Sequence, residues 1–144
     1  IDKIVKQQFE FGKLILNAGL TPIIEPEVTI NIPQKSKVEE ILKKSLVKNL
    51  NKLGSKQYVL LKLTLPEKEN FYEDLVKHSN VLRVVALSGG YSLAEANKRL
   101  EENYGVVASF SRALTQNLFV HQSTDEFNSA LAQTISTIAA ASET

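Results

Sequence analysis

Apolar residues follow two alternating periods along this chain. From Ile4 to Leu16 they recur every three or four residues, which predicts a helix that ends at Gly19. The next segment, Pro22–Val28, is short and carries prolines, which is typical of an extended run. Because a proline cannot donate to a strand ladder, Pro26 indicates a strand end or a bulge there.

A second helix is predicted from about Lys37 to Leu53. Ser36 and Glu39 have the spacing of a capping box, and Gly54 marks the end of the helix. Its apolar stripe consists of Ile41, Leu42, Leu46, Leu50 and Leu53.

The rest of the chain continues the alternation of apolar runs and helical spacing. The apolar runs predict strands at Tyr58–Leu65, Val81–Leu87 and Val106–Ser109. Helical spacing predicts helices at 69–77, from Ser92 to about Tyr104, and from Ser123 to about Ala141. The last two begin at a serine with a glutamate three residues later, namely Glu95 and Glu126.

Strands that alternate with helices need crossover connections, and these produce a parallel sheet. The predicted fold class is therefore α/β, and 144 residues are enough for one domain. An open doubly wound sheet and a (β/α)₈ barrel both have this order of elements. The polar residues at the strand ends favour the barrel.

Composition narrows the possible partners. Lys and Arg total 17 against 16 Asp and Glu, so no net field favours nucleic acid or an anionic membrane. The chain has no Cys, and its two histidines, His78 and His121, are interpreted as surface residues without metal-ligand spacing. Four lysines on the second helix are interpreted as a solvated face: Lys43, Lys44, Lys48 and Lys52. We expect no metal or other cofactor, no membrane span and a cytoplasmic location.

Lys62 is the residue whose position most strongly suggests chemistry. It shares one face of its predicted strand with Leu60 and Thr64, while Leu61, Leu63 and Leu65 form the opposite face. If the leucine face packs on helices, Lys62 points into the interior of the sheet or barrel. Removal from water disfavours the charged form of a lysine, and a neutral amine can attack a carbonyl. A snorkelling lysine at a strand end is the alternative.

Glu25 and Glu27 stand two residues apart in the first extended run, so they face the same way. They have two interpretations: an ion pair with Lys62 or a solvated strand end, and a general acid/base beside the amine. Both acids and the lysine fall near the carboxyl ends of consecutive strands, where α/β proteins place their active sites.

Two further strand ends have features of a phosphate site. Ser88, Gly89 and Gly90 lead from the third strand into a capped helix, where backbone amides attract phosphate. Ser109 and Arg112 follow the fourth strand, and an arginine can bind an oxyanion through two nitrogens. In barrels, the loops after the last two strands often share one phosphate site, so these strands are interpreted as strands five to eight.

Together these segments resemble class I fructose-1,6-bisphosphate aldolase, the Schiff-base type, in its short bacterial form. The matching stretches are Pro22-Ile23-Ile24-Glu25-Pro26-Glu27, Leu60-Leu61-Lys62-Leu63, Leu87-Ser88-Gly89-Gly90-Tyr91-Ser92 and Ser109-Phe110-Ser111-Arg112-Ala113-Leu114. The resemblance implies reversible cleavage of fructose 1,6-bisphosphate to dihydroxyacetone phosphate and glyceraldehyde 3-phosphate, a step of glycolysis.

The resemblance also implies a role for each candidate residue. Lys62 forms the imine, Glu25 handles protons, and Glu27 lies beside it. The remaining candidates hold the substrate: Ser88, Gly89 and Arg112 bind phosphate, and Ser109 lies in the pocket. Ser111 stands where animal members have glycine, which weakens the expectation of a backbone contact to phosphate there.

A complete (β/α)₈ barrel has about 250 residues, far more than this chain. Residues 1–144 are therefore expected to be the C-terminal half, strands five to eight, of a catalytic TIM barrel. The expected partners are the missing N-terminal half or a second copy of the chain, and a phosphorylated sugar. The open alternatives are another Schiff-base aldolase and a non-catalytic phosphate-binding or assembly half-barrel.

Overall fold

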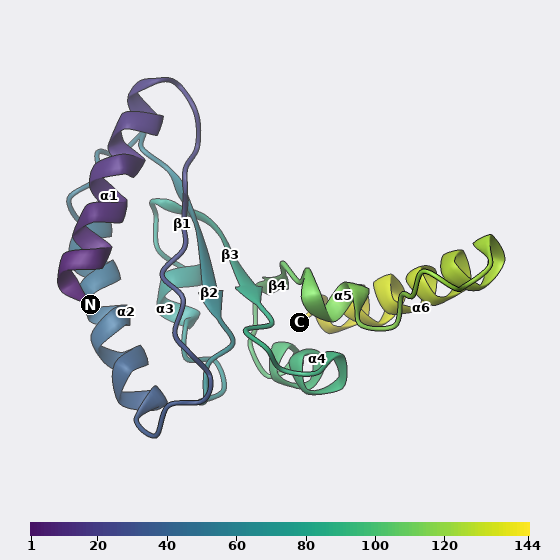
Figure 1. The fold of residues 1–144 in the computed structure, drawn as a ribbon. Coiled ribbons are helices and arrows are strands. Elements are labelled where there is room, and N and C mark those ends of the chain that lie inside the picture. Colours follow the sequence, from purple (N-terminus) through teal and green to yellow (C-terminus); the bar gives the residue numbers. More distant parts are fainter.

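The computed structural model describes residues 1–144 and confirms an α/β chain in which helices and strands alternate (Figure 1). Its strands are β1 (Ile23–Ile24), β2 (Val59–Thr64), β3 (Val81–Leu87) and β4 (Val106–Ala108). Its helices are α1 (Asp2–Asn17), α2 (Lys35–Leu50), α3 (Glu73–Val76), α4 (Leu93–Glu101), α5 (Arg112–Thr115) and α6 (Thr124–Ala141).

The four strands form one parallel sheet in the order β1-β2-β3-β4. Each strand therefore lies beside its neighbour in sequence, and each connection contains a helix. The register aligns Lys62 of β2 with Val85 of β3, and Val85 with Val107 of β4. These three residues form a row across one face of the sheet.

The two faces of the sheet have different surroundings. The face with Leu61, Leu63 and Val84 belongs to the single core cluster, which also contains side chains from all six helices. Lys62 and Val85, on the opposite face, are outside that cluster and only half-buried. All the core packing of the helices is thus on one face, because consecutive crossovers of one hand place successive helices on the same side.

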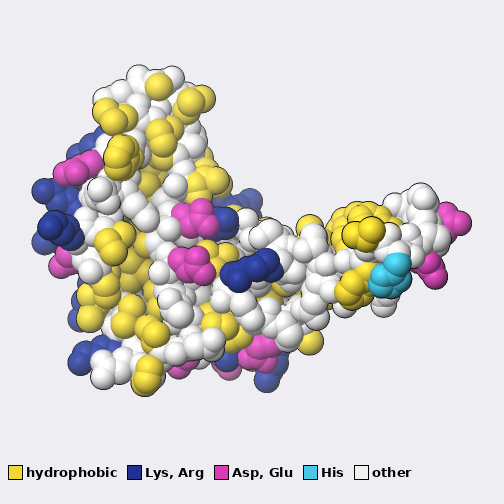
Figure 2. Space-filling model, in the orientation of Figure 1, with side chains coloured by type: hydrophobic (Ala, Val, Ile, Leu, Met, Phe, Trp, Pro, Cys, Tyr) yellow, Lys and Arg dark blue, Asp and Glu magenta, His cyan; other side chains and the backbone are white.

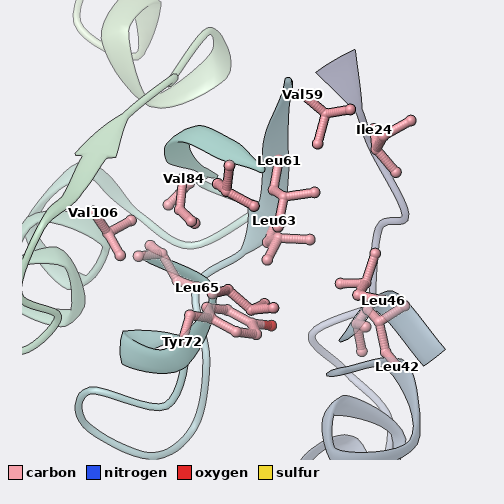
Figure 3. Close-up of a cluster of buried hydrophobic side chains, with 14 of the residues drawn as sticks. Ile24, Leu42, Leu46, Val59, Leu61, Leu63, Leu65, Tyr72, Val84 and Val106 are labelled. Atoms are coloured by element: carbon pink, nitrogen blue, oxygen red, sulfur yellow. The ribbon is translucent and has the colours of Figure 1, made fainter. Parts of the chain in front are cut away.

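The leucine face of β2 confirms the predicted alternation. Figure 3 shows Leu61, Leu63 and Leu65 pointing into a cluster with Leu42 and Leu46 of α2. All three β2-segment leucines are at most 1% exposed. Full burial of a leucine side chain contributes about 1.5–3 kcal/mol, so this face anchors the strand that carries Lys62.

Several predicted bounds differ from the structure. The first strand shortens to two residues because Pro26 interrupts it, and α3 covers only four residues. The predicted capping role of Ser36 is wrong: α2 begins at Lys35, with Gln34 at the cap position and no side-chain cap. Glu39, the other half of that predicted box, is instead buried in an ion pair with Lys35.

The serine caps of the two later helices are confirmed. The Ser92 hydroxyl accepts a hydrogen bond from the Glu95 amide, and Ser123 and Glu126 form a full capping box. These bonds to Ser123 hold the pKa of the Glu126 carboxyl below its usual range. The capped helix α6 projects away from the sheet (Figure 1). None of the helices is both long and apolar enough to span a bilayer.

Candidate active site

Lys62 lies near the carboxyl end of β2, on the face that the core cluster leaves open. Its side chain is 27% exposed, so it is half-buried. Leu60 and Thr64 share its face, and Val85 of β3 lies beside it in the register. The amine is therefore held by a rigid strand and remains open to a ligand.

Glu25 follows β1 directly and meets Lys62. The Glu25 carboxylate lies 2.6 Å from the Lys62 amine, and its side chain is 46% exposed. The Gln8 amide of α1 donates a hydrogen bond to the Glu25 carbonyl at 3.2 Å, which fixes the backbone there. A carboxylate at this distance from an ammonium group can accept its proton and return it, which is the geometry needed for general acid/base catalysis.

Glu27 is not brought to Lys62. The alternation of exposed Glu25 and Glu27 with buried Pro26 and Val28 confirms that the two acids share a face. Glu27, however, forms no ion pair; it lines a hollow of about 130 Å³ between this segment, α1 and α2. Glu27 is therefore close to Glu25 along the chain but does not pair with Lys62, and its role stays a prediction.

Ser88 and Gly89 form the turn after β3. Ser88 is 4% exposed, and its carbonyl accepts a hydrogen bond from the Tyr91 amide. Gly89 has φ = +62°, and a Cβ at this position would lie 3.0 Å from Ile30 and 3.2 Å from Thr64. Glycine is needed here for both its backbone conformation and its close approach to the loop that follows Glu25.

The loop after β4 lies beside this turn. The Ser109 amide donates to the Ala86 carbonyl at 2.8 Å, and the Leu93 amide donates to the Gln116 side chain at 3.0 Å. Arg112 is exposed as the first residue of α5, and its side chain has no ion pair or hydrogen bond. The two predicted phosphate loops are thus adjacent, and a free cation lies in one of them.

The side chains of Ser88 and Lys62 are separated along the sheet. Because Lys62 aligns with Val85, Ser88 lies three residues further along its strand, or roughly 10 Å. The Lys62 amine instead lies against Glu25, which follows β1 on the other side of β2.

Three residues that support this site were not predicted from the sequence. Lys35 is 2% exposed and donates to the Leu65 carbonyl at 2.8 Å while pairing with Glu39. Glu39 accepts from the Glu67 amide at 3.2 Å, so the pair fixes the turn after β2. Thr64 accepts from the Val28 amide at 2.9 Å. The four-residue separation of Lys35 and Glu39 was the one available signal.

The histidines and lysines outside the site have structural surroundings. His121 is exposed, as predicted, and stacks on Phe119. His78 is half-buried, and its two ring nitrogens contact Asn51 and the Asn80 amide. Lys43 is 25% exposed and lies over the Phe71 ring, whereas the other three lysines of that face are exposed. No group of three or more His, Asp or Glu side chains converges as a metal site would.

Substituting alanine at two glycines separates backbone strain from contact. Gly89→Ala should destabilise the chain by roughly 2–4 kcal/mol, since it adds contacts with Ile30 and Thr64 to the strain of a left-handed residue. Gly19→Ala, with φ = +78° and no atom within 4 Å of the new Cβ, should cost only about 1–2 kcal/mol. Urea unfolding measures both, and equal losses would contradict the close packing at Gly89.

The fold and the site first define a class: parallel α/β proteins with a lysine–carboxylate pair near the carboxyl ends of adjacent strands. Curated relatives then define the family. The chain is 56% identical over 144 residues to fructose-bisphosphate aldolase class 1 of Synechocystis sp. PCC 6803, covering all of this chain and 48% of that protein. All of the chain is thus homologous to class 1 fructose-bisphosphate aldolases, as the sequence resemblance predicted.

Two other relatives with the same name give the same match. The identity is 52% over 144 residues with the Clostridium acetobutylicum protein, covering all of this chain and 49% of that one. With the Porphyromonas gingivalis protein it is 51% over 142 residues, or 99% of this chain and 48% of that one. The chain therefore spans about half the length of the curated relatives it matches. No family model matches the chain.

Proposed function

We propose that this chain supplies the imine-forming part of a class I fructose-bisphosphate aldolase. The single observation that carries the proposal is the pair of Lys62 and Glu25, 2.6 Å apart on the open face of the sheet. The relatives are named fructose-bisphosphate aldolase class 1. By the resemblance, the reaction is cleavage of fructose 1,6-bisphosphate into two triose phosphates. By the resemblance, that reaction belongs to glycolysis, which runs in the cytoplasm.

The geometry supports a definite order of proton transfers. Glu25 takes a proton from the Lys62 ammonium group, and the neutral amine then adds to the substrate ketone. The same carboxyl returns the proton as the carbinolamine loses water, which leaves a protonated imine on Lys62. The Glu25 carboxylate, deprotonated again after water has left, takes the proton of the C4 hydroxyl while electrons from the C3–C4 bond move into the imine, and glyceraldehyde 3-phosphate leaves. The enamine is then protonated and hydrolysed, which releases dihydroxyacetone phosphate and restores the amine.

The phosphate groups are assigned to the adjacent loops after β3 and β4. The Ser88–Gly89 turn offers backbone amides next to a capped helix, and Arg112 offers an unpaired guanidinium group. Ser109 lies at the base of the second loop, beside the imine pocket in this proposal. Glu27 is assigned a supporting catalytic role, since it lies on the same segment as Glu25.

A half-barrel architecture fits the one-sided packing of the sheet. The order β1-β2-β3-β4 with helices on one face is that of a barrel wall, and β1 and β4 are free edges. Since the relatives are about twice as long, we propose that these are strands five to eight of a (β/α)₈ barrel. The other strands would come from the rest of a longer chain or from a second copy, because free strand edges favour pairing.

Borohydride trapping tests the proposal. The longest natural polypeptide that carries this sequence is incubated with dihydroxyacetone phosphate, reduced with borohydride and mapped by mass spectrometry. We expect one reduced adduct, on Lys62. No adduct with the complete polypeptide would refute the aldolase assignment and favour a non-catalytic phosphate-binding half. An adduct only with a different aldehyde or ketone would indicate another Schiff-base aldolase.

A further inference from the structure

Thr64 is a buried polar residue to which the reaction above assigns no part. It lies two residues beyond Lys62 on the same face of β2 and is 1% exposed. Its hydroxyl oxygen accepts a hydrogen bond from the Val28 amide at 2.9 Å. The segment that carries Glu25 is thus fixed to the strand that carries the amine.

The Thr64 hydroxyl takes the place of the backbone hydrogen bonds between β1 and β2 that Pro26 prevents. β1 pairs with β2 only at Ile23 with Leu60 and at Ile24 with Leu61. Continued register would align Glu25 with Lys62 and Glu27 with Thr64, but Pro26 has no N–H to donate. The chain rejoins β2 at Val28, through the Thr64 hydroxyl rather than through a backbone carbonyl.

Glu25 is therefore held between two attachments to β2. The ladder at Ile24 precedes it, and the Val28–Thr64 hydrogen bond follows it. Val28 is itself 4% exposed, so its amide has no access to water if the threonine acceptor is removed. Both attachments lie on the strand of Lys62, so they limit the range of distances between carboxylate and amine.

We infer that Thr64 is a positioning residue that sets the Glu25 carboxylate against the Lys62 amine. The inference deepens the proposed function and rests on it for its catalytic meaning. Its structural part, the placement of Glu25 by Thr64, is independent of any substrate. Pro26 interrupts the sheet and frees the acid from the ladder, and Thr64 restores a fixed geometry two residues later.

Chemical labelling of Lys62 tests the structural part. The rate of acetylation by acetic anhydride is measured at Lys62 by mass spectrometry, because an amine paired with a carboxylate reacts more slowly. Thr64→Val keeps the shape but removes the acceptor, and it should speed labelling about two- to fivefold, the scale of a half-exposed ion pair. Thr64→Ser keeps the acceptor and should restore the wild-type rate.

Three further variants separate positioning from a general effect. Glu25→Gln should speed labelling as much as Thr64→Val, and the double variant should show no additional increase. Thr134→Val is the matched control, because Thr134 is 4% exposed but binds only the Ala130 carbonyl within α6.

A Thr64→Val rate equal to wild type would overturn the inference, and so would unchanged labelling in Glu25→Gln. If Thr64→Val does not fold, rapid exchange of the Val28 amide proton in the wild-type protein would overturn the inference and slow exchange would support it.

Imine formation tests the catalytic part. With the complete natural polypeptide and dihydroxyacetone phosphate, Thr64→Val should form the borohydride-reducible adduct about ten- to a hundredfold more slowly, part of the effect of a positioned acid/base group. Thr64→Ser should recover most of the rate. An equal rate in wild type and Thr64→Val would remove the catalytic role. No adduct in the wild type would instead contradict the proposed function, while labelling would still decide the placement of Glu25.

Discussion

Replacing Lys62 with arginine should abolish the borohydride-reducible adduct and lower aldol cleavage on the order of 10⁵-fold or more, the scale seen when a covalent nucleophile is removed. Arginine keeps the positive charge and can still pair with Glu25, so the site should remain folded. Its guanidinium group stays protonated in proteins and cannot attack a ketone. Trapping, peptide mapping and a coupled cleavage assay on the complete polypeptide measure the change.

A matched lysine provides the control for this prediction. Lys68 also pairs with a carboxylate, that of Glu40 at 2.9 Å, but its side chain is 59% exposed and lies after β2. Lys68→Arg should leave both adduct and cleavage rate near wild type. If Lys62→Arg still forms an adduct, or if the adduct maps to another lysine, Lys62 is not the imine-forming residue.

Breaking the buried pair of Lys35 and Glu39 should be the most destabilising charge substitution in the chain. The two side chains are each 1% exposed, and they bind the Leu65 carbonyl and the Glu67 amide. Lys35→Met leaves the Glu39 carboxylate buried without a cation, which typically costs about 3–5 kcal/mol. Since a whole domain is stable by only about 5–15 kcal/mol, this loss is a large fraction of the total.

Urea unfolding followed by circular dichroism measures the effect. Lys77→Met is the matched control, because Lys77 pairs with Glu73 at the same four-residue spacing but is 65% exposed. That variant should change stability by no more than about 0.5 kcal/mol. Replacing both Lys35 and Glu39 with methionine should cost less than Lys35→Met alone, since no unpaired charge remains. A loss below about 1 kcal/mol for Lys35→Met would contradict the burial of the pair.

The sequence predicted those features that depend on local chemistry. The apolar runs of the strands are short and strongly patterned. The bounds of β3 were therefore predicted as observed, and so was the buried leucine face of β2. Serine caps with an acid three residues later were right at Ser92 and Ser123, where nothing tertiary competes. At Ser36 the same signal failed, because burial of Lys35 and Glu39 outweighs the roughly 1 kcal/mol of a cap.

The four-residue helix α5 shows a different limit. It covers Arg112–Thr115, which is too short to display a helical period, and only its packing against α6 and its link to α4 stabilise it. Arg112 was predicted as a phosphate ligand in a loop; the structure places it at the start of this helix. The predicted role of Arg112 thus rests on its position after the fourth strand, whereas the helix in which it lies depends on tertiary contacts.

The Lys62 site divides in the same way. Sequence determined its chemistry: an amine on an alternating strand, two acids of one face before it, and glycine and arginine at the next strand ends. Only the tertiary structure decided the 2.6 Å contact between Glu25 and the amine, the half-burial of Lys62, and the hydrogen bond by which Thr64 holds the acid-bearing segment. The physical reason is that residue type and spacing determine which side chains share a face. The distance between Glu25 and Lys62, by contrast, depends on tertiary structure, because Pro26 interrupts the backbone pairing of β1 with β2 and the Thr64 hydroxyl provides the next attachment between the two segments.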